Sequence, residues 1–309
     1  ASVPLEDLWP GQGNSIPNLE EYFSSIQGEQ QQGERPEPDM TAAVHFLDVG
    51  HGDAVLMESG GEYALLDAGP SEGIDNLMSY LAYLEIDSLK YLIMSHPHED
   101  HIGGMQTVVE YVPVEQVLLP DFDKGPYPTT STFEKLLDAM LEKELPTSTM
   151  RTGEEYPLGN GSIEVLQDGV EHDGNFNLLS PMLLFEAGDM RFLATGDAEK
   201  ANEKAALESG VSLWATLYKA AHHGSSTSNT PEFLEEVNPW LTVIPCGKDN
   251  IYGHPHREVL EDLEALGSGI LRTDVDGFIR VTPDGEGGLQ ASTTTPREEP
   301  QSEPQTQAA

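Results

Sequence analysis

The residues best suited to chemistry lie in the hexapeptide His96–His101, which places three imidazoles and Asp100 within six positions. It directly follows the apolar run 90–95, which is typical of a buried strand, so we expect the hexapeptide on the loop at that strand's carboxyl end. Open α/β layers build their sites at such ends. Imidazoles and carboxylates are ligands of borderline divalent metals, and four of them can reach two ions about 3.5 to 4 Å apart. The alternative is a solvated polar loop that happens to be rich in histidine.

The pattern His-x-His-x-Asp-His after a strand resembles the signature of the metallo-β-lactamase superfamily. Other segments with the same resemblance occur in the expected order, at 45–54, 63–69, 192–197, 217–226, 252–256 and 271–277. Together they resemble the metallo-β-lactamase domain of ComEC competence proteins, across residues 42 to 283. This combination is specific, which favours metal chemistry over the polar-loop alternative.

The resemblance implies an α/β (α+β) fold, a four-layer αββα sandwich with two mixed sheets face to face and the metals at one sheet edge. It implies two divalent ions, with Zn²⁺ expected and Mn²⁺ as the alternative, and hydrolysis of a phosphodiester. DNA is the expected substrate, and an association with a DNA-uptake system is the expected context. Because fold does not fix substrate, two alternatives stay open. One is hydrolysis of another ester or amide (a phosphocholine ester, a lactone or a β-lactam), and the other is a non-catalytic DNA-uptake accessory protein.

The family pattern also implies a ligand set. His96 and His98 would hold one ion, Asp100 and His101 the second, and Asp197 would bridge both. One imidazole of His222 and His223 would complete the second site. Adjacent residues that leave a strand point to opposite sides, so we do not expect both on one ion, and His222 is slightly favoured. Asp67 is expected to orient a ligand imidazole, as metal-bound histidines usually require. His172 is interpreted as an ordinary loop residue, which leaves the first ion with an open position.

The late loops are expected to handle substrate. Asp100 and His254 are the expected catalytic residues, with His254 contacting phosphate or protonating the leaving oxygen. The expected substrate-binding residues offer neutral or positive donors, namely Lys219, Ser225, Ser226 and Lys248. Asp48 and Asp53 flank a Gly-x-Gly turn, and turn chemistry and function are equally good explanations for both. His45, inside an apolar strand, is interpreted as a packing residue.

The charge is extreme: 54 acidic residues stand against 15 basic ones, for a net charge of −39. Such a chain repels itself in dilute buffer, since salt screens charge only beyond about 10 Å at 0.1 M and beyond about 3 Å at 1 M. The composition therefore predicts a protein adapted to concentrated salt, as in halophiles. Together with the resemblance and the lack of a membrane part, it leads us to expect a stand-alone haloarchaeal protein that acts outside the cell or at its surface, with a cytoplasmic location as the alternative. High salt also weakens phosphate attraction, so a nuclease of this kind must depend on metals and a few local cations.

The chain shows no run long enough to cross a bilayer, and its single cysteine, Cys246, excludes an intramolecular disulfide. It begins at Ala1, which leaves a removed signal peptide open. Composition predicts a flexible leader over 1–40 and a disordered tail over 287–309. The resemblance implies that the part between them, 41–286, is a hydrolase domain of the metallo-β-lactamase fold. Periodicity predicts strands near 42–48, 53–58, 62–67, 90–94, 116–119, 162–166, 180–186, 190–195, 216–220, 241–245, 270–273 and 277–282. It predicts helices over 74–84, 104–111, 132–144, 199–209, 231–237 and 256–266.

Overall fold

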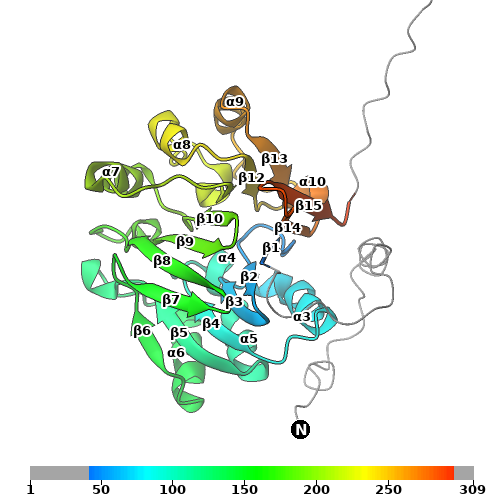
Figure 1. The fold of residues 1–309 in the computed structure, drawn as a ribbon. Helices are drawn as coiled ribbons and strands as arrows, with labels where there is room; N and C mark the ends of the chain where they lie inside the picture. The colour runs from blue at the N-terminus through cyan, green and yellow to red at the C-terminus, as the bar shows by residue number, and fades with distance from the viewer. Residues whose placement is uncertain (1–41, 296–309) are drawn as a thin grey trace, which may run out of the picture.

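The computed structural model describes residues 42–295, which form two β-sheets with helices on their outer sides (Figure 1). The expected leader over 1–40 and the part of the expected tail from residue 296 onward lie outside the described residues. Within residues 42–295, no helix combines the length and the apolar composition that crossing a bilayer requires.

The first sheet has eight strands in the order β15-β14-β1-β2-β3-β4-β5-β6. Its strands are β1 (Ala43–Phe46), β2 (Val55–Ser59), β3 (Glu62–Leu66), β4 (Leu89–Ile93), β5 (Val114–Leu119), β6 (Thr147–Thr149), β14 (Ile279–Pro283) and β15 (Leu289–Thr293). The run from β3 to β6 is parallel, and the rest of the sheet is antiparallel. The carboxyl ends of β3, β4 and β5 therefore meet at one edge of the molecule.

The second sheet has seven strands in the order β13-β12-β11-β10-β9-β8-β7. Its strands are β7 (Glu155–Leu158), β8 (Gly161–Gln167), β9 (Met182–Ala187), β10 (Met190–Ala194), β11 (Leu217–Lys219), β12 (Leu241–Ile244) and β13 (Gly269–Arg272). Strands β10 to β13 run parallel to one another. Here too the carboxyl ends of neighbouring strands come together, as they do in the first sheet.

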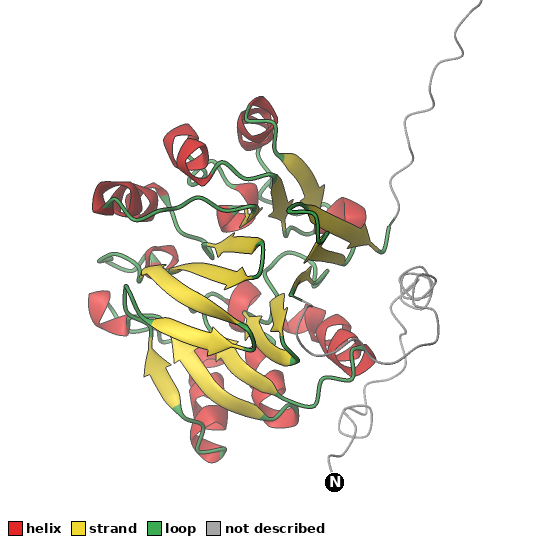
Figure 2. Cartoon of the chain, in the orientation of Figure 1, coloured by secondary structure: helices red, strands yellow, loops and turns green. Residues whose placement is uncertain are grey.

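The helices lie on both outer sides of the paired sheets (Figure 2). On the first sheet's side they are α3 (Ile74–Tyr83), α5 (Met105–Tyr111) and α6 (Ser131–Glu142), and on the second sheet's side they are α7 (Lys200–Ser209), α8 (Pro231–Val237) and α9 (Arg257–Ala265). Two one-turn helices, α4 (Glu99–Ile102) and α10 (Thr273–Asp276), lie in loops. The α7 helix begins with a capping box in which the side chains of Glu199 and Asn202 bond each other's backbone N–H groups.

Buried apolar side chains form three clusters, one for each interface between layers. Alternate strand residues point to opposite faces, so Ala64 and Leu66 of β3 enter the cluster between the sheets while Leu65 enters the cluster under the helices. Between the sheets, the rings of Phe46 and Phe192 meet edge to face at 5.5 Å. Three such interfaces require four layers, which confirms the predicted αββα sandwich.

The carboxyl-terminal boundary of the domain was predicted wrongly. Residues 287–295 belong to the folded part of the chain, because β15 pairs along its whole length with β14. The Thr294 hydroxyl also accepts the backbone N–H of Phe278. The composition of this segment predicts disorder because only a few of its residues are apolar, and the backbone pairing that orders it leaves no signal in composition.

Candidate metal centre

The candidate site lies where the parallel strands of both sheets end. The β4 strand ends at Ile93, just before the histidine hexapeptide, and β10 ends at Ala194, just before Asp197. The next strand, β11, ends at Lys219 and leads into the turn Ala221–Gly224. The predicted position of the hexapeptide, after a buried strand, is confirmed, although its second half forms the one-turn helix α4 with His98 as the N-cap.

Asp197 lies at the centre of the cluster. Its Oδ1 is 3.3 Å from His101 Nε2, and its Oδ2 is 3.6 Å from His222 Nε2, 3.7 Å from His223 Nε2 and 3.9 Å from His96 Nε2. His98 joins through its Nδ1, which is 3.0 Å from His96 Nε2. Each of these four imidazoles thus lies within 4 Å of one of the two oxygens of Asp197. A carboxylate that bridges two ions needs ligands of both ions around it in this way.

A compact subset fits a cation. One ligand atom from each of Asp100, His101, Asp197 and His223 lies within 4.8 Å of every other. Three of these groups also have buried polar atoms without a hydrogen-bond partner, namely His101 Nε2, Asp197 Oδ1 and His223 Nε2. Buried polar atoms are almost always satisfied, so several orphaned lone pairs aimed at one point need an explanation. A divalent ion held by these residues would supply it.

The tautomers support the same conclusion. His101 Nδ1 donates to Asp67 Oδ2 at 2.9 Å, and His223 Nδ1 donates to the carbonyl of Pro245 at 3.0 Å. With the proton held on Nδ1, each ring presents the lone pair of Nε2 to the cluster, as a metal ligand does. Asp67 in turn accepts the N–H of Ser95 at 2.8 Å, so its carboxylate is held on both sides. Asp67 was predicted to orient a ligand imidazole, and these two contacts are the ones that this role requires.

The carboxylates and imidazoles of the cluster shift each other's pKa values in opposite directions. Burial alone would raise the pKa of Asp197, but His101 and His223 hold it well below its usual value. Burial alone would lower the pKa of His101, but the carboxylates of Asp197 and Asp100 raise it well above the usual value. The carboxylates therefore stay ionised and demand positive charge at this position. A dication would take over that role from the imidazole protons.

The turn that contains His222 and His223 differs from the prediction. Both residues have left-handed backbones, with φ of 51° and 53°, so they do not continue a strand and strand alternation does not describe them. Such strain in residues other than glycine is typical of functional sites. Their ring centroids are 6.1 Å apart. His223, and not the favoured His222, joins the compact set with Asp100 and His101.

Lys219 was predicted to bind substrate, and the structure contradicts this. The side chain is fully buried, and its Nζ pairs with Asp53 Oδ2 at 2.6 Å and donates to the carbonyl of Gly196 at 3.0 Å. Asp53 Oδ1 also lies 3.4 Å from His223 Nδ1. Turn chemistry and function were the two explanations for Asp53. Its buried ion pair with Lys219, beside His223, favours function. Asp48 instead accepts the N–H of Gly50 at 3.3 Å, as turn chemistry predicts.

A cavity of about 360 Å³ opens over the cluster. The residues that line it are His51, His98, Glu99, Asp100, Asn177, Asp197, His222, His223, Tyr252 and His254. Four of them, His51, Glu99, Asn177 and Tyr252, were not predicted as site residues. Only the two glycines around His51 gave a signal. At Gly52 any side chain would collide with the backbone oxygen of Asp100, so this turn is built to pack against α4.

His254 lines this cavity as predicted, and its Nδ1 is buried without a hydrogen-bond partner. Burial and the neighbouring His223 lower its pKa to about 3, so the ring is neutral at neutral pH. A neutral imidazole offers one N–H to an oxygen and has no imidazolium proton to transfer. A neutral ring at neutral pH therefore fits contact with a phosphate oxygen better than protonation of the leaving oxygen, and both roles remain predictions.

The remaining predicted donors do not line the cavity. Ser225 is buried, and its hydroxyl bonds to that of Thr227 at 3.1 Å, so it braces the turn and does not bind substrate as predicted. Ser226 lies in a separate depression beside His256, and Lys248 is exposed outside the cavity. His172 packs against Phe176 and also lies outside the cavity, as its interpretation as a loop residue requires.

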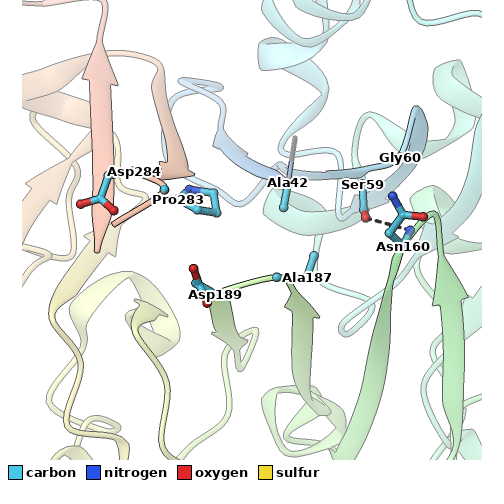
Figure 3. Close-up of a pocket in the computed structure, with 10 residues that line it drawn as sticks. Ala42, Ser59, Gly60, Asn160, Ala187, Asp189, Pro283 and Asp284 are labelled. Atoms are coloured by element: carbon cyan, nitrogen blue, oxygen red, sulfur yellow. Dashed lines mark hydrogen bonds between the residues drawn. The ribbon is translucent and has the colours of Figure 1, made fainter. Parts of the chain in front are cut away.

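A second cavity of about 360 Å³ lies at the opposite ends of the strands, between the β2–β3 and β9–β10 hairpins and the end of β14 (Figure 3). Of the described residues that line it, only Asp189 and Asp284 can ionise. Figure 3 shows these carboxylates beside small side chains, with the N–H of Asn160 bonded to the Ser59 hydroxyl. No imidazole is among these residues, so the chemistry belongs to the other end of the sandwich.

Comparison with known proteins supports this assignment. The family model of the metallo-β-lactamase superfamily matches residues 47–247. ComE operon protein 3 of Bacillus subtilis is 29% identical over 77% of this chain, which corresponds to 32% of that protein. Competence protein ComA of Neisseria gonorrhoeae is 28% identical over 83% of this chain and 35% of its own length. The chain thus spans about a third of the length of these curated relatives.

Among solved structures, the metallo-hydrolase Igni18 of Ignicoccus hospitalis superposes with a TM-score of 0.51 at 13% identity, covering 77% of this chain and 98% of that one. This likeness shows the fold, which agrees with the four layers described above. The match of the family model begins just after β1, extends past β12 and includes both the hexapeptide and Asp197. The chain therefore belongs to the metallo-β-lactamase superfamily.

Proposed function

We propose that this protein is a metal-dependent phosphodiester hydrolase that acts on DNA. The observation that supports it best is the convergence of His96, His98, Asp100, His101, Asp197 and His223 below one open cavity. The relative named competence protein ComA supports a DNA-uptake system as the context, and DNA is the substrate that fits this context. Phosphocholine esters, lactones and β-lactams are the competing substrates.

Two divalent ions, with zinc expected and manganese as the alternative, would supply Lewis acidity and lower the pKa of water at this site. His96 and His98 would hold one ion, Asp100, His101 and His223 the other, and Asp197 would lie between them. His254 and His51 face the same cavity with neutral rings, since burial lowers the pKa of His51 to about 4. Their N–H groups are placed to donate to the non-bridging oxygens of a phosphodiester, where negative charge gathers during hydrolysis.

An assay panel tests the proposed reaction. The full chain, reconstituted with Zn²⁺ or Mn²⁺ in molar KCl, is offered plasmid DNA, single-stranded DNA, RNA, bis-p-nitrophenyl phosphate and nitrocefin. We expect cleavage of DNA and of the small diester, and we expect this cleavage to be lost on chelation. Turnover of nitrocefin without DNA cleavage would reverse the ranking of substrates. DNA binding without any hydrolysis would favour the accessory protein.

We also propose that the protein is salt-adapted and works outside the cell or at its surface. The net charge of −39 leaves repulsion that only a short screening length can suppress. We therefore expect the far-ultraviolet circular dichroism and the Tm to rise together as KCl increases from millimolar to molar concentration. Full folding and activity in millimolar salt would contradict this proposal. Detection of the protein in the culture medium or on intact cells tests its location.

A further inference from the structure

Tyr252 is an exposed aromatic side chain on the cavity over the metal ligands, and its chain neighbour Ile251 is also exposed. Tyr252 lines the cavity, yet its side chain is 61% exposed, and Ile251 is 92% exposed. The surface of a chain with a net charge of −39 offers few such positions. A large apolar side chain kept in water at the entrance of a site is typical of a surface that contacts a ligand.

The Tyr252 ring is stacked on one side only. It lies 5.1 Å from the His51 ring at 23° and 5.6 Å from the His254 ring at 21°. These two imidazoles are only 5.6 Å from each other, so both lie on the same side of the tyrosine. With 61% of the residue exposed, the other face of the ring is open to solvent.

The open ring is close to the metal ligands. The His51 ring contacts both Tyr252 and His223, whose centroid is 4.5 Å away, so a single ring separates Tyr252 from the cluster. A planar group stacked on Tyr252 would therefore lie beside whatever occupies the cavity. In a nucleic acid strand, the planar group nearest to a phosphate is the base on the adjoining sugar.

The loop that contains Tyr252 is held in place before any ligand binds. The side chain of Asn250 accepts the N–H of His254 at 2.9 Å and donates to the carbonyls of His254 and Gly247. The N–H of Gly247 donates to His51 Nδ1 at 3.3 Å. At Gly247 a Cβ would lie 2.6 Å from the backbone nitrogen of His51, so glycine allows the loop to dock on that turn. Binding at a preformed ring costs little ordering entropy.

We propose that the open face of Tyr252 stacks the nucleobase adjacent to the scissile phosphate and thereby selects nucleic acid over other phosphodiesters. This inference rests on the proposed function and specifies how its substrate is recognised. Stacking on a neutral ring is insensitive to salt, whereas phosphate attraction falls steeply as salt rises. A strongly acidic protein in molar salt thus gains affinity from an aromatic platform that it cannot gain from lysines.

The test compares Tyr252→Leu with Tyr252→Phe on two single-stranded oligonucleotides of equal length, one with bases and one abasic. In the leucine variant we expect KM for the base-bearing strand to rise about 5- to 150-fold, the range for loss of one stacked base. Its kcat should stay near the parent value, and cleavage of the abasic strand should not change. Tyr252→Phe retains the ring and should behave as the parent. Trp240→Leu removes another exposed aromatic, from outside the cavity, and should change nothing.

A binding measurement separates this inference from the proposed reaction. A methylphosphonate oligonucleotide with bases has no cleavable diester, and its Kd for the metal-loaded chain should rise in Tyr252→Leu as KM does. Tyr252-dependent binding in a parent protein that cleaves no phosphodiester would overturn the proposed hydrolysis and leave the stacking intact. A parent protein that cleaves DNA while Tyr252→Leu alters both strands equally, or neither, would overturn the stacking and leave the hydrolysis intact.

Discussion

Replacing Asp197 by asparagine is expected to lower kcat/KM for DNA by about 10³-fold or more, since a metal site supplies several kcal/mol of transition-state stabilisation and each 1.4 kcal/mol is a factor of ten. Among residues 42–295, Asp197 is the one carboxylate within 4 Å of all four of His96, His101, His222 and His223. The amide keeps the shape of the side chain but has no charge and one fewer acceptor oxygen. Metal content per chain, measured by elemental analysis in parallel with kinetics, should fall below that of the parent.

Asp189→Asn is the matched control for this prediction. It makes the same chemical change at an exposed position of the cavity at the opposite ends of the strands, where no imidazole is among the lining residues. We expect unchanged metal content and activity. An Asp197→Asn protein with full metal occupancy and more than a tenth of the parent activity would show that this carboxylate does not bridge the ions. The ligand assignment would then be wrong at its centre.

The sequence predicts the central part of this site well because metal chemistry restricts it locally. Three histidines and Asp100 lie within six residues after an apolar run, and the backbone that follows a buried strand leaves them little freedom of position. Asp197 was implied by the resemblance to the metallo-β-lactamase superfamily, and it lies three residues beyond the end of β10. The two-residue period of the strands likewise predicts which side chains enter the core. The short strands β6 and β7, with three and four residues, were missed because so few residues show no clear period.

Features that depend on contacts distant in sequence were not predictable in this way. Lys219 was predicted to bind substrate because nothing near it in the sequence indicates its partner, Asp53, which lies 166 positions earlier in the loop before β2. His51 and Tyr252 were missed because each is ordinary within its own loop, and their stacking exists only once the two loops meet. The choice between His222 and His223 depended on the left-handed backbone conformation of both residues. Histidine does not usually adopt this conformation, so the sequence shows no sign of it. Residues fixed by tertiary packing therefore require the fold itself.

The second large effect is expected from Lys219→Met, which should lower the free energy of unfolding by about 3 to 5 kcal/mol, the cost of leaving one member of a buried ion pair without its partner. Both Lys219 and Asp53 have 1% exposure or less, so water cannot take the place of the ammonium group. Methionine fills a similar volume, and the loss therefore reflects charge more than packing. Urea unfolding at fixed molar KCl measures it. Lys204→Met removes an exposed lysine paired with Glu208 at 3.7 Å and should change stability by less than about 0.5 kcal/mol.

The double variant Lys219→Met with Asp53→Leu separates the pair from its surroundings. If the cost comes from the uncompensated carboxylate, removing that carboxylate as well should recover most of the lost stability, because apolar replacement of a whole buried pair is often neutral. Metal affinity should not recover, since Asp53 Oδ1 lies 3.4 Å from His223 Nδ1 and Lys219 bonds the carbonyl of Gly196, next to Asp197. Loss of such supporting contacts costs about 10- to 100-fold in metal affinity. Additive stability losses in the double variant would show that Lys219 and Asp53 act independently, and the loss in Lys219→Met would then not come from the broken pair.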